Sequence, residues 1–299
     1  MATSEIEQQR DLLAGPSLED LNPASLSLKE VNWKEFPWWF AALIVIAIGT
    51  LAIILLSPSF NEAFMTIVPG VGVTISATLL AFAFAVVLGL ITGLGRISDK
   101  VLPKNLATLY VELVRGVPML VLIFFIALVL VPALVRGSNA LGVSLFEAGV
   151  LAENNFLSDL SIRSIPMFAR AVIALSLTYG AFLAEVFRAG IQSISKGQME
   201  AARSQGMSYA QAMRYVILPQ AIRNVLPALG NDFISMLKDS SLVSILAVRD
   251  ITQTARLYAG HSFRFNESYV SLAVLYLTMT VSLSLVIKII ERRMSTNDR

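Results

Sequence analysis

The residues with the clearest potential for chemistry are two adjacent opposite charges, Lys238 and Asp239, in the otherwise apolar segment MLKDSSLVS. Each charge at the centre of a membrane helix costs about 2.5 to 3.5 kcal/mol on insertion scales, so it is expected to face the protein interior and find a partner. Neighbours on a helix point about 100° apart, so the two side chains can present opposite charges to different parts of one cavity. A zwitterionic ligand, such as a free amino acid, requires a cation near its carboxylate and an anion near its ammonium group.

Hydroxyl groups close to these charges could add hydrogen bonds to a ligand. Ser240 and Ser241 follow the charged pair directly, and Tyr179 lies at comparable depth in the preceding apolar segment. Small hydroxyls in membrane helices also pack or bond to their own backbone, and a core-packing role explains Tyr179 equally well. Lys238 could instead form an ion pair with Asp232, so its role stays open between a ligand contact and a structural pair.

The composition excludes several other kinds of chemistry. The chain has no cysteine and a single histidine, His261, which rules out thiol catalysis, disulfides and histidine-cluster metal sites. It contains no G-x-x-x-x-G-K-[ST] sequence, so it lacks a P-loop for ATP. We therefore expect no catalytic residue, metal or cofactor on this chain, and a net charge of +2 is too small to indicate nucleic acid as a partner.

A polar loop over residues 190–223 is the second stretch that indicates function. One short helix is expected to end at Gly206, because glycine adopts the left-handed conformation that terminates helices. Ser208 and Gln211 form a capping box for a second short helix, which Pro219 is expected to end or bend. Two short helices joined by a glycine turn between apolar segments are expected to contact a partner.

The elements that must position these residues are membrane helices. Of the 299 residues, 56% are hydrophobic and only 15% are charged, with a mean hydropathy of +0.70, whereas soluble domains carry about a quarter charged residues. The sequence predicts an all-α integral membrane protein with about six transmembrane helices. They are expected at 38–56, 71–94, 117–134, 166–186, 226–248 and 269–290.

The connections between these helices also carry predictions. Residues 57–69 are expected to form a short outer loop and residues 135–165 a longer one, while the part of the third apolar stretch before Val117 is expected to be a bent or interfacial helix. Lysine and arginine are about three times as frequent in the predicted inner segments as in the outer loops, which predicts that both termini lie inside.

The polar loop resembles the EAA motif, E-A-A-x3-G-x9-I-x-L-P, of the membrane subunits of bacterial ABC importers. The matching residues are Glu200, Ala201, Ala202, Gly206, Leu218 and Pro219. The only departure is Val216, where the family motif has isoleucine. The resemblance implies that these residues form a coupling helix that docks into a cleft of a separate ATPase subunit. Glu185 and Arg188, at the inner boundary, are interpreted as structural or as part of that interface.

Two further segments resemble the polar amino-acid permeases of this group. YVELVRGVPMLVLIFF is similar to their Y-x-E-x-x-R-G-T-P-x-x-x-Q segment, with Val117 in place of the usual threonine, and LKDSSLVS is similar to L-K-D-[ST]-S-L-V-S. In the family, the acidic residue and nearby polar groups line the substrate pocket. The resemblance therefore implies that Asp239 holds the α-amino group or a basic side chain of the substrate, and that Lys238 could hold a carboxylate.

The resemblance implies a five-helix type I ABC importer core at 70–293. The helix and connector at 37–69 are then an addition, and 1–36 and 294–299 are cytoplasmic tails. The implied partners are an ABC ATPase subunit dimer that binds ATP and Mg²⁺, a second permease subunit, identical or homologous, and an extracytoplasmic solute-binding protein. The implied setting is the lipid bilayer of a bacterial inner membrane, across which an amino-acid substrate passes.

Two other classes of protein compete with this interpretation. A stand-alone secondary amino-acid transporter would also explain charges at membrane depth, but it gives no purpose to the 190–223 loop. A membrane enzyme is disfavoured because the predicted helices hold no cluster of carboxylates, and the chain has one histidine and no cysteine.

Overall fold

The computed structural model describes residues 38–295, and all regular structure in that range is helical. The predicted tail at 1–36 and all but the first two residues of the tail at 294–299 lie outside the described residues. The chain divides into two units, residues 1–49 and residues 50–299, and the packing described below is that of the second unit alone.

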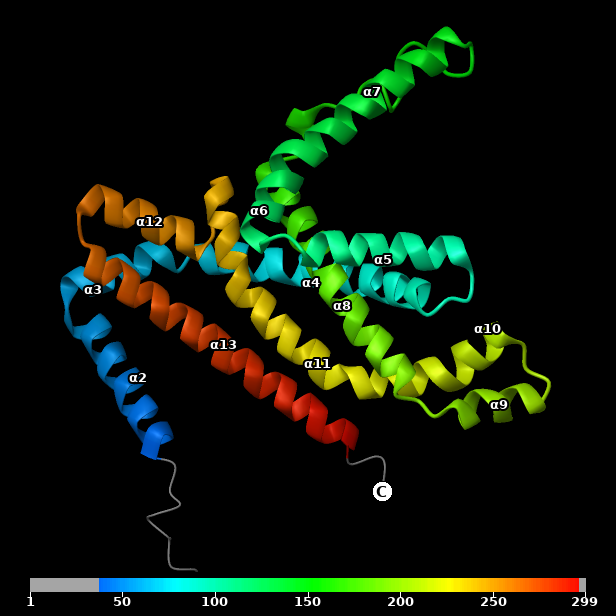
Figure 1. Cartoon of the computed structure of the whole chain (residues 1–299). Helices are drawn as coiled ribbons and strands as arrows, with labels where there is room; N and C mark the ends of the chain where they lie inside the picture. The colour runs from blue at the N-terminus through cyan, green and yellow to red at the C-terminus, as the bar shows by residue number, and fades with distance from the viewer. Residues whose placement is uncertain (1–37, 296–299) are drawn as a thin grey trace, which may run out of the picture. The chain divides into compact units, whose positions relative to one another are not determined.

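Most of the helices follow one another with short connections, and a longer non-helical segment, 148–161, separates α7 from η3 (Figure 1). In chain order they are α2 (Trp38–Leu56), α3 (Pro58–Ile67), α4 (Gly70–Arg96), α5 (Val101–Arg115), α6 (Met119–Phe124), η2 (Phe125–Leu130), α7 (Val131–Glu147), η3 (Ile162–Ser164), α8 (Met167–Gln192), α9 (Lys196–Ser204), α10 (Tyr209–Ala212), η4 (Met213–Ile217), α11 (Leu218–Asp239), η5 (Ser240–Leu246), α12 (Ile251–Ser262) and α13 (Phe265–Ser295). The first of these has the bounds that the sequence predicts for its first apolar helix.

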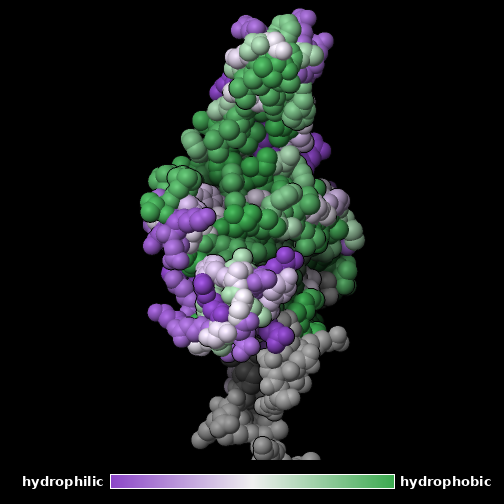
Figure 2. All heavy atoms as spheres, turned by 90° about the vertical axis from the view of Figure 1, so that its right-hand side faces the viewer, coloured by the Kyte–Doolittle hydropathy of each residue, from purple (hydrophilic) through white to green (hydrophobic). Residues whose placement is uncertain are grey.

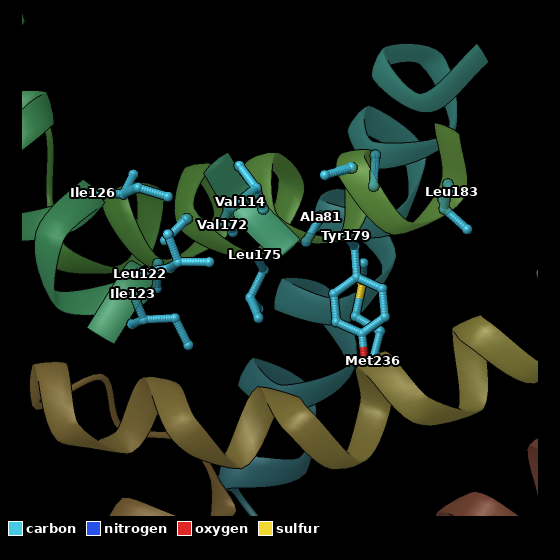
Figure 3. Close-up of a cluster of buried hydrophobic side chains, with 14 of the residues drawn as sticks. Ala81, Val114, Leu122, Ile123, Ile126, Val172, Leu175, Tyr179, Leu183 and Met236 are labelled. Atoms are coloured by element: carbon cyan, nitrogen blue, oxygen red, sulfur yellow. The ribbon is translucent and has the colours of Figure 1, made fainter. Parts of the chain in front are cut away.

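The core of the second unit is the close packing of α4 against α8. Gly89 and Gly93 of α4 face α8, where a Cβ atom at Gly89 would lie 2.7 Å from the Cβ of Leu183 and one at Gly93 would lie 2.9 Å from the carbonyl oxygen of Ala184. Small residues on both helices therefore allow the two backbones to approach closely. The buried cluster around this contact extends to α5, α6 and α11 (Figure 3).

The outer connection at 57–69 is helical, so the prediction of a short loop is wrong there. Helix α3 begins at Pro58, a residue suited to the first turn of a helix, and buries Ala63 and Ile67 on one side. Ile67 packs with residues of α12 and α13 in a second buried cluster. The segment is amphipathic, and its polar residues explain why it was predicted to be a loop.

The helix is interrupted just before Met119, at Pro118, and a single long helical stretch follows. Helix α5 ends at Arg115, in agreement with the predicted bend before the third span, and the helical path resumes at Met119. It runs through the π-helical segment η2 into α7 and ends at Glu147. Residues 135–147 are therefore helix and not the predicted loop. Polar residues there, such as Arg136 and Ser138, lower the hydropathy without breaking the helix.

Within the described residues, four helical stretches are long and apolar enough to cross a membrane: 58–96, 119–147, 167–192 and 265–292. A shorter apolar helix covers Val45–Leu56. Helix α11 is much less apolar, since it carries Asn224, Asn231 and Asp232 besides the charged pair at its end. The six-span count and the orientation remain predictions.

Candidate functional site

A hydrogen bond joins α8 to the end of α11. The Tyr179 side chain points from α8 toward α11, next to Met236 (Figure 3). Its hydroxyl donates to Oδ2 of Asp239 at 2.7 Å, and only 4% of the tyrosine is exposed. Asp239 itself is the last residue of α11 and is partly exposed. The structure thus brings together two of the predicted ligand residues from helices that are distant in sequence.

The serines that follow Asp239 differ in what they can offer a ligand. The helix tightens to 3-10 geometry over Ser240–Leu246, and Ser240 is fully buried with its hydroxyl donating to the Leu237 carbonyl at 2.7 Å. That bond to its own backbone is one of the alternatives open at the level of sequence. Ser241 is only partly buried.

Lys238 is exposed, so the expectation that its charge faces the protein interior is not met in the single chain. It lies on a different side of α11 from Asp239, as the turn of about 100° per residue predicts. Among the residues that the structure describes, it forms no ion pair with Asp232. Asp232 instead lies near enough to Tyr179 to interact with it electrostatically. The Tyr179 hydroxyl therefore has two carboxylates in its neighbourhood, those of Asp239 and Asp232. Lys238 forms an ion pair with neither of them among the described residues.

The polar loop has the local structure that its sequence predicts, with one exception. Gly206 has a φ of +83°, and the Ser208 and Gln211 side chains both make their capping-box hydrogen bonds at the start of α10. The exception is partial: Pro219 was expected to end or bend the second short helix, and it does not end it. The chain runs through a π-helical segment, Met213–Ile217, directly into α11, where Pro219 occupies the first turn.

The motif residues of this loop divide into a buried or partly buried set, called the inner set, and a solvent-exposed set, called the outer set; the two names refer to burial and not to sides of the membrane. Ala202 is buried and Leu218 is partly buried, next to a small apolar cluster that includes Met213 and Ile217. The outer set is exposed and consists of Glu200, Ala201, Gly206 and Pro219. Figure 2 shows hydrophilic residues gathered around the end of the loop that carries α9 and α10, with hydrophobic residues over neighbouring helices. The outer set is free to meet a partner, while the inner set fixes the loop against its own base.

A group of five charged residues lies near the C-terminal ends of three helices, and the sequence alone did not connect them. Its members, called the Glu185 cluster below, are Arg96 of α4, Glu112 and Arg115 of α5, and Glu185 and Arg188 of α8. Only the spacing of Glu185 and Arg188, three residues apart on one helix, is a local signal of the contact.

A buried carboxylate also lies at the start of α12. Asp250 caps this helix by accepting a hydrogen bond from the Gln253 backbone at 2.8 Å, and its Oδ2 has no hydrogen-bond partner. Burial raises the pKa of Asp250 to about 6, against the lowering effect of its hydrogen bonds. Within residues 38–295 no three acidic, histidine or cysteine side chains are grouped so as to hold a metal ion.

Comparison with known families and sequences gives consistent matches. The family described as "Binding-protein-dependent transport system inner membrane component" matches residues 85–296. The chain is 36% identical over 221 residues to the probable glutamine ABC transporter permease protein GlnM of Bacillus subtilis (strain 168), covering 74% of this chain and 89% of the relative. It is 32% identical over 228 residues to the glutamine transport system permease protein GlnP of Escherichia coli (strain K12), covering 76% and 92%.

Solved structures match the same region. A chain from a structure described as "Crystal structure of an amino acid ABC transporter with histidines" is 36% identical, with a TM-score of 0.60, and the match covers 81% of this chain and 97% of that one. A chain of the inward-facing MetNI methionine ABC transporter is 19% identical, with a TM-score of 0.58 and coverage of 77% and 96%, which shows likeness of fold alone.

Proposed function

The chain belongs to the family of inner membrane components of binding-protein-dependent transport systems, and we propose that it is the permease subunit of an importer for polar amino acids. The relatives that it matches are named as amino-acid ABC transporter permeases, which favours this function over that of a secondary transporter. Transport is by alternating access, and the energy comes from ATP hydrolysed on a separate subunit.

The observation that carries this proposal is the structure of the 190–223 loop. Its family motif is complete except for Val216, and its exposed residues lie on α9 (Glu200 and Ala201), in the turn after α9 (Gly206) and in the first turn of α11 (Pro219). Gly206 has open space around its Cα, so its positive φ and not a tight contact requires the glycine. We assign ATPase coupling to this loop, with Glu200, Ala201, Gly206 and Pro219 at the contact and Ala202 and Leu218 as its support.

The membrane arrangement follows from the proposed function. Six spans with both termini inside leave the 190–223 loop on the cytoplasmic side, where an ATPase can reach it. Helix α2 is then an addition at 37–69 to an importer domain at 70–293, between cytoplasmic tails at 1–36 and 294–299. The setting is the inner membrane of a bacterium, a proposal supported by the family's description as an inner membrane component.

The partners are those that an importer of this family needs. An ATPase dimer binds ATP and Mg²⁺ and receives the coupling loops. A second permease, identical or homologous, completes the pathway, because a pore at a two-fold or pseudo-two-fold interface needs two permease chains. A binding protein delivers the amino acid at the outer face.

We assign the substrate contact to the Tyr179–Asp239 pair. Asp239 supplies an anion for the α-ammonium group or a basic side chain, Tyr179 orients its carboxylate, and Ser241 can add a hydrogen bond. Ser240 has the supporting role that its backbone bond suggests. Lys238 is exposed in the single chain, so a contact with the substrate carboxylate would be made from the face toward the second permease.

The test is reconstitution in liposomes of this chain with its co-expressed ATPase and a loaded binding protein. Asp239→Asn is expected to leave the complex assembled and to reduce amino-acid uptake by at least about tenfold, the effect of losing roughly 1.4 kcal/mol of a charged contact. The control is Asp159→Asn, the same change at an exposed position in the outer connection, which is expected to leave uptake unaltered.

The coupling loop is tested in the same preparation. Gly206→Asp is expected to lower ATP hydrolysis and uptake, because it strains a left-handed position and adds a charge to the docking surface. Gly197→Asp adds the same charge to the same loop at an exposed position where φ is not positive, and a smaller effect is expected. Uptake driven by an ion gradient, with no ATPase bound to the wild-type chain, would replace this proposal with the secondary transporter.

A further inference from the structure

Glu185 is the centre of the five-residue charge cluster near the C-terminal ends of α4, α5 and α8. Its Oε1 accepts a hydrogen bond from Nη1 of Arg96 and lies 3.7 Å from Nη1 of Arg115. Its Oε2 accepts from Nε and Nη2 of Arg188, at 2.8 and 2.7 Å. Arg96 also reaches Oε1 of Glu112, at 3.5 Å. One carboxylate therefore contacts arginines from three helices.

The members of the Glu185 cluster differ in their exposure to solvent, and this difference determines how much each ion pair contributes to holding the helices together. The side chains of Glu185 and Arg96 are 19% and 15% exposed, whereas those of Arg115 and Glu112 are 45% and 66% exposed. Exposed ion pairs contribute little to stability, while removing one partner of a sheltered pair leaves an uncompensated charge. Without the Glu185 charge, Arg96 would retain only its contact with the exposed Glu112, and Arg115 and Arg188 would lose the ion pairs that they make with Glu185.

The Glu185 cluster continues into the base of the 190–223 loop. Arg188 donates from Nη1 to the side-chain oxygen of Gln192 at 2.8 Å, and Gln192 is the last residue of α8. The next residue, Ser193, accepts a hydrogen bond from the Asn224 side chain of α11 at 3.0 Å. A series of polar contacts therefore leads from Arg96 through Glu185 and Arg188 to Gln192, the last residue of α8. Its chain neighbour Ser193 is in turn bonded to α11, where the loop ends.

In the other direction, the Glu185 cluster reaches the Tyr179–Asp239 pair. The Arg115 guanidinium lies 5.9 Å from the centre of the Phe182 ring, a distance typical of cation–π contacts. The Phe182 ring lies 6.1 Å from that of Tyr179. Tyr179, Phe182 and Glu185 follow one another at intervals of three residues on α8, so they are neighbours along one side of the helix.

We propose that Glu185 is a positioning residue of the transport cycle, which holds the C-terminal ends of α4, α5 and α8 together so that displacement of the coupling loop reaches the Tyr179–Asp239 pair. This role rests on the proposed function, since it requires an ATPase that moves the loop. Glu185 contacts neither the substrate nor the ATPase in this role. It determines how much of the loop's movement is transmitted to the helices around the site.

The experiment compares uptake with ATP hydrolysis in the reconstituted complex. Glu185→Gln keeps the size of the side chain and removes its charge. We expect the complex to assemble and ATP to be hydrolysed, while amino-acid uptake per ATP falls by at least about fivefold, the lower end of typical coupling effects. Glu112→Gln is the matched control, the same change at the exposed carboxylate of the Glu185 cluster, and is expected to leave the ratio unchanged.

Two further variants keep the test decisive if Glu185→Gln does not assemble. Glu185→Asp retains the charge but places it one methylene group closer to the backbone. The complex with this variant is expected to assemble and to show reduced amino-acid uptake per ATP. The double variant Arg96→Glu with Glu185→Arg restores opposite charges across α4 and α8, and is expected to recover part of the ratio lost in Arg96→Glu alone.

The proposal is overturned if the ratio is unchanged in an assembled Glu185→Gln or Glu185→Asp complex. It is also overturned if uptake and ATP hydrolysis fall together in proportion to the amount of complex, because that is the result of a purely structural role. Failure of the wild-type chain to bind any ATPase is a different outcome, and it overturns the proposed function itself.

Discussion

Helices α8 and α13 are both long enough and apolar enough to cross a membrane, yet they have opposite surroundings. In the most apolar 18-residue window of each, 61% of the α8 residues are buried but only 11% of those in α13. The buried helix is the less hydrophobic of the two, with a mean hydropathy of 1.6 against 2.2. Hydropathy therefore reports how well a helix suits the bilayer and not whether it packs in the protein core.

Residue size explains the difference between the two helices. Lipid tails are as apolar as leucine, so burial of large side chains gives no net drive for membrane helices to associate, and close contact depends on small residues. The buried positions of α8 include Ala171, Ala174, Gly180, Ala181 and Ala184. The exposed positions of α13 include Leu277, Val281, Leu285, Val286 and Ile289.

The largest expected effect comes from filling the contact between α4 and α8. In Gly89→Leu the new Cβ would lie 2.7 Å from Leu183 Cβ and 3.1 Å from its backbone carbon, which the helices can accommodate only by moving apart. Overpacking of this kind costs about 1 to 3 kcal/mol or more. Thermal unfolding of the purified chain in detergent should show a clear loss of stability.

The matched control for this prediction lies on the same helix. A Cβ atom at Gly72 would have no neighbouring atom within 4 Å, so Gly72→Leu adds the same side chain without a clash. Replacing a helical glycine there should leave stability equal or slightly higher, by up to about 1 kcal/mol. Equal destabilisation by both variants would mean that the α4–α8 contact is not the close packing described above.

An intermediate effect is expected at the start of α12, where the carboxyl group of Asp250 is buried. Because the pKa of Asp250 is raised from 3.8 to about 6, the folded state holds this proton more tightly than the unfolded state. The free energy of unfolding should therefore fall as pH rises from 3.8 to about 6, by up to about 1.4 kcal/mol per pH unit. Unfolding temperatures at pH 5 and pH 7 measure the effect.

Asp250→Asn should remove this part of the pH dependence, since the amide oxygen can still cap α12 but cannot ionise. Asp159→Asn, at an exposed position, serves as the comparison and should retain the wild-type profile. The same pH profile in Asp250→Asn and the wild-type chain would show that another group is responsible.

The smallest effect is expected from two threonines that make the same bond in opposite surroundings. Thr178, buried in α8, and Thr278, exposed on α13, each donate to the carbonyl four residues earlier, at 2.8 Å. Because each hydroxyl is satisfied by its own helix, Thr178→Val and Thr278→Val should both change stability by less than about 1 kcal/mol. A large loss at Thr178 alone would indicate a contact between helices that depends on its hydroxyl.

Local signals in the sequence predicted much of the fold. The bounds of α2 follow from its apolar run, and the turn at Gly206 and the capping box at Ser208 follow from residues only a few positions apart. The errors arise where hydropathy was used to judge helix formation. Residues 58–67 and 135–147 are helical, although their polar residues led to the prediction of loops.

The candidate site was predicted only in part, because it depends on contacts between distant segments. The charge of Asp239 and its neighbours suggested the site, but only the fold reveals that the Tyr179 hydroxyl meets this carboxylate. The Glu185 cluster is less visible still, since Arg96 is 89 positions away from Glu185 in sequence. The different directions of Lys238 and Asp239 follow from helix geometry, but the exposure of Lys238 in the single chain was not predicted, because each charge was expected to face the protein interior.

The glycines of α4 also have a consequence for synthesis of the chain at the ribosome. Their contact surface is made by Leu183, Ala184 and Phe187, which are added to the chain roughly ninety residues after Gly89. At about 5 to 20 residues per second, α4 is complete some 5 to 20 s before α8 exists. During that interval the glycine face of α4 has no partner from α8, and it must persist in lipid until the helix that fits it has been inserted.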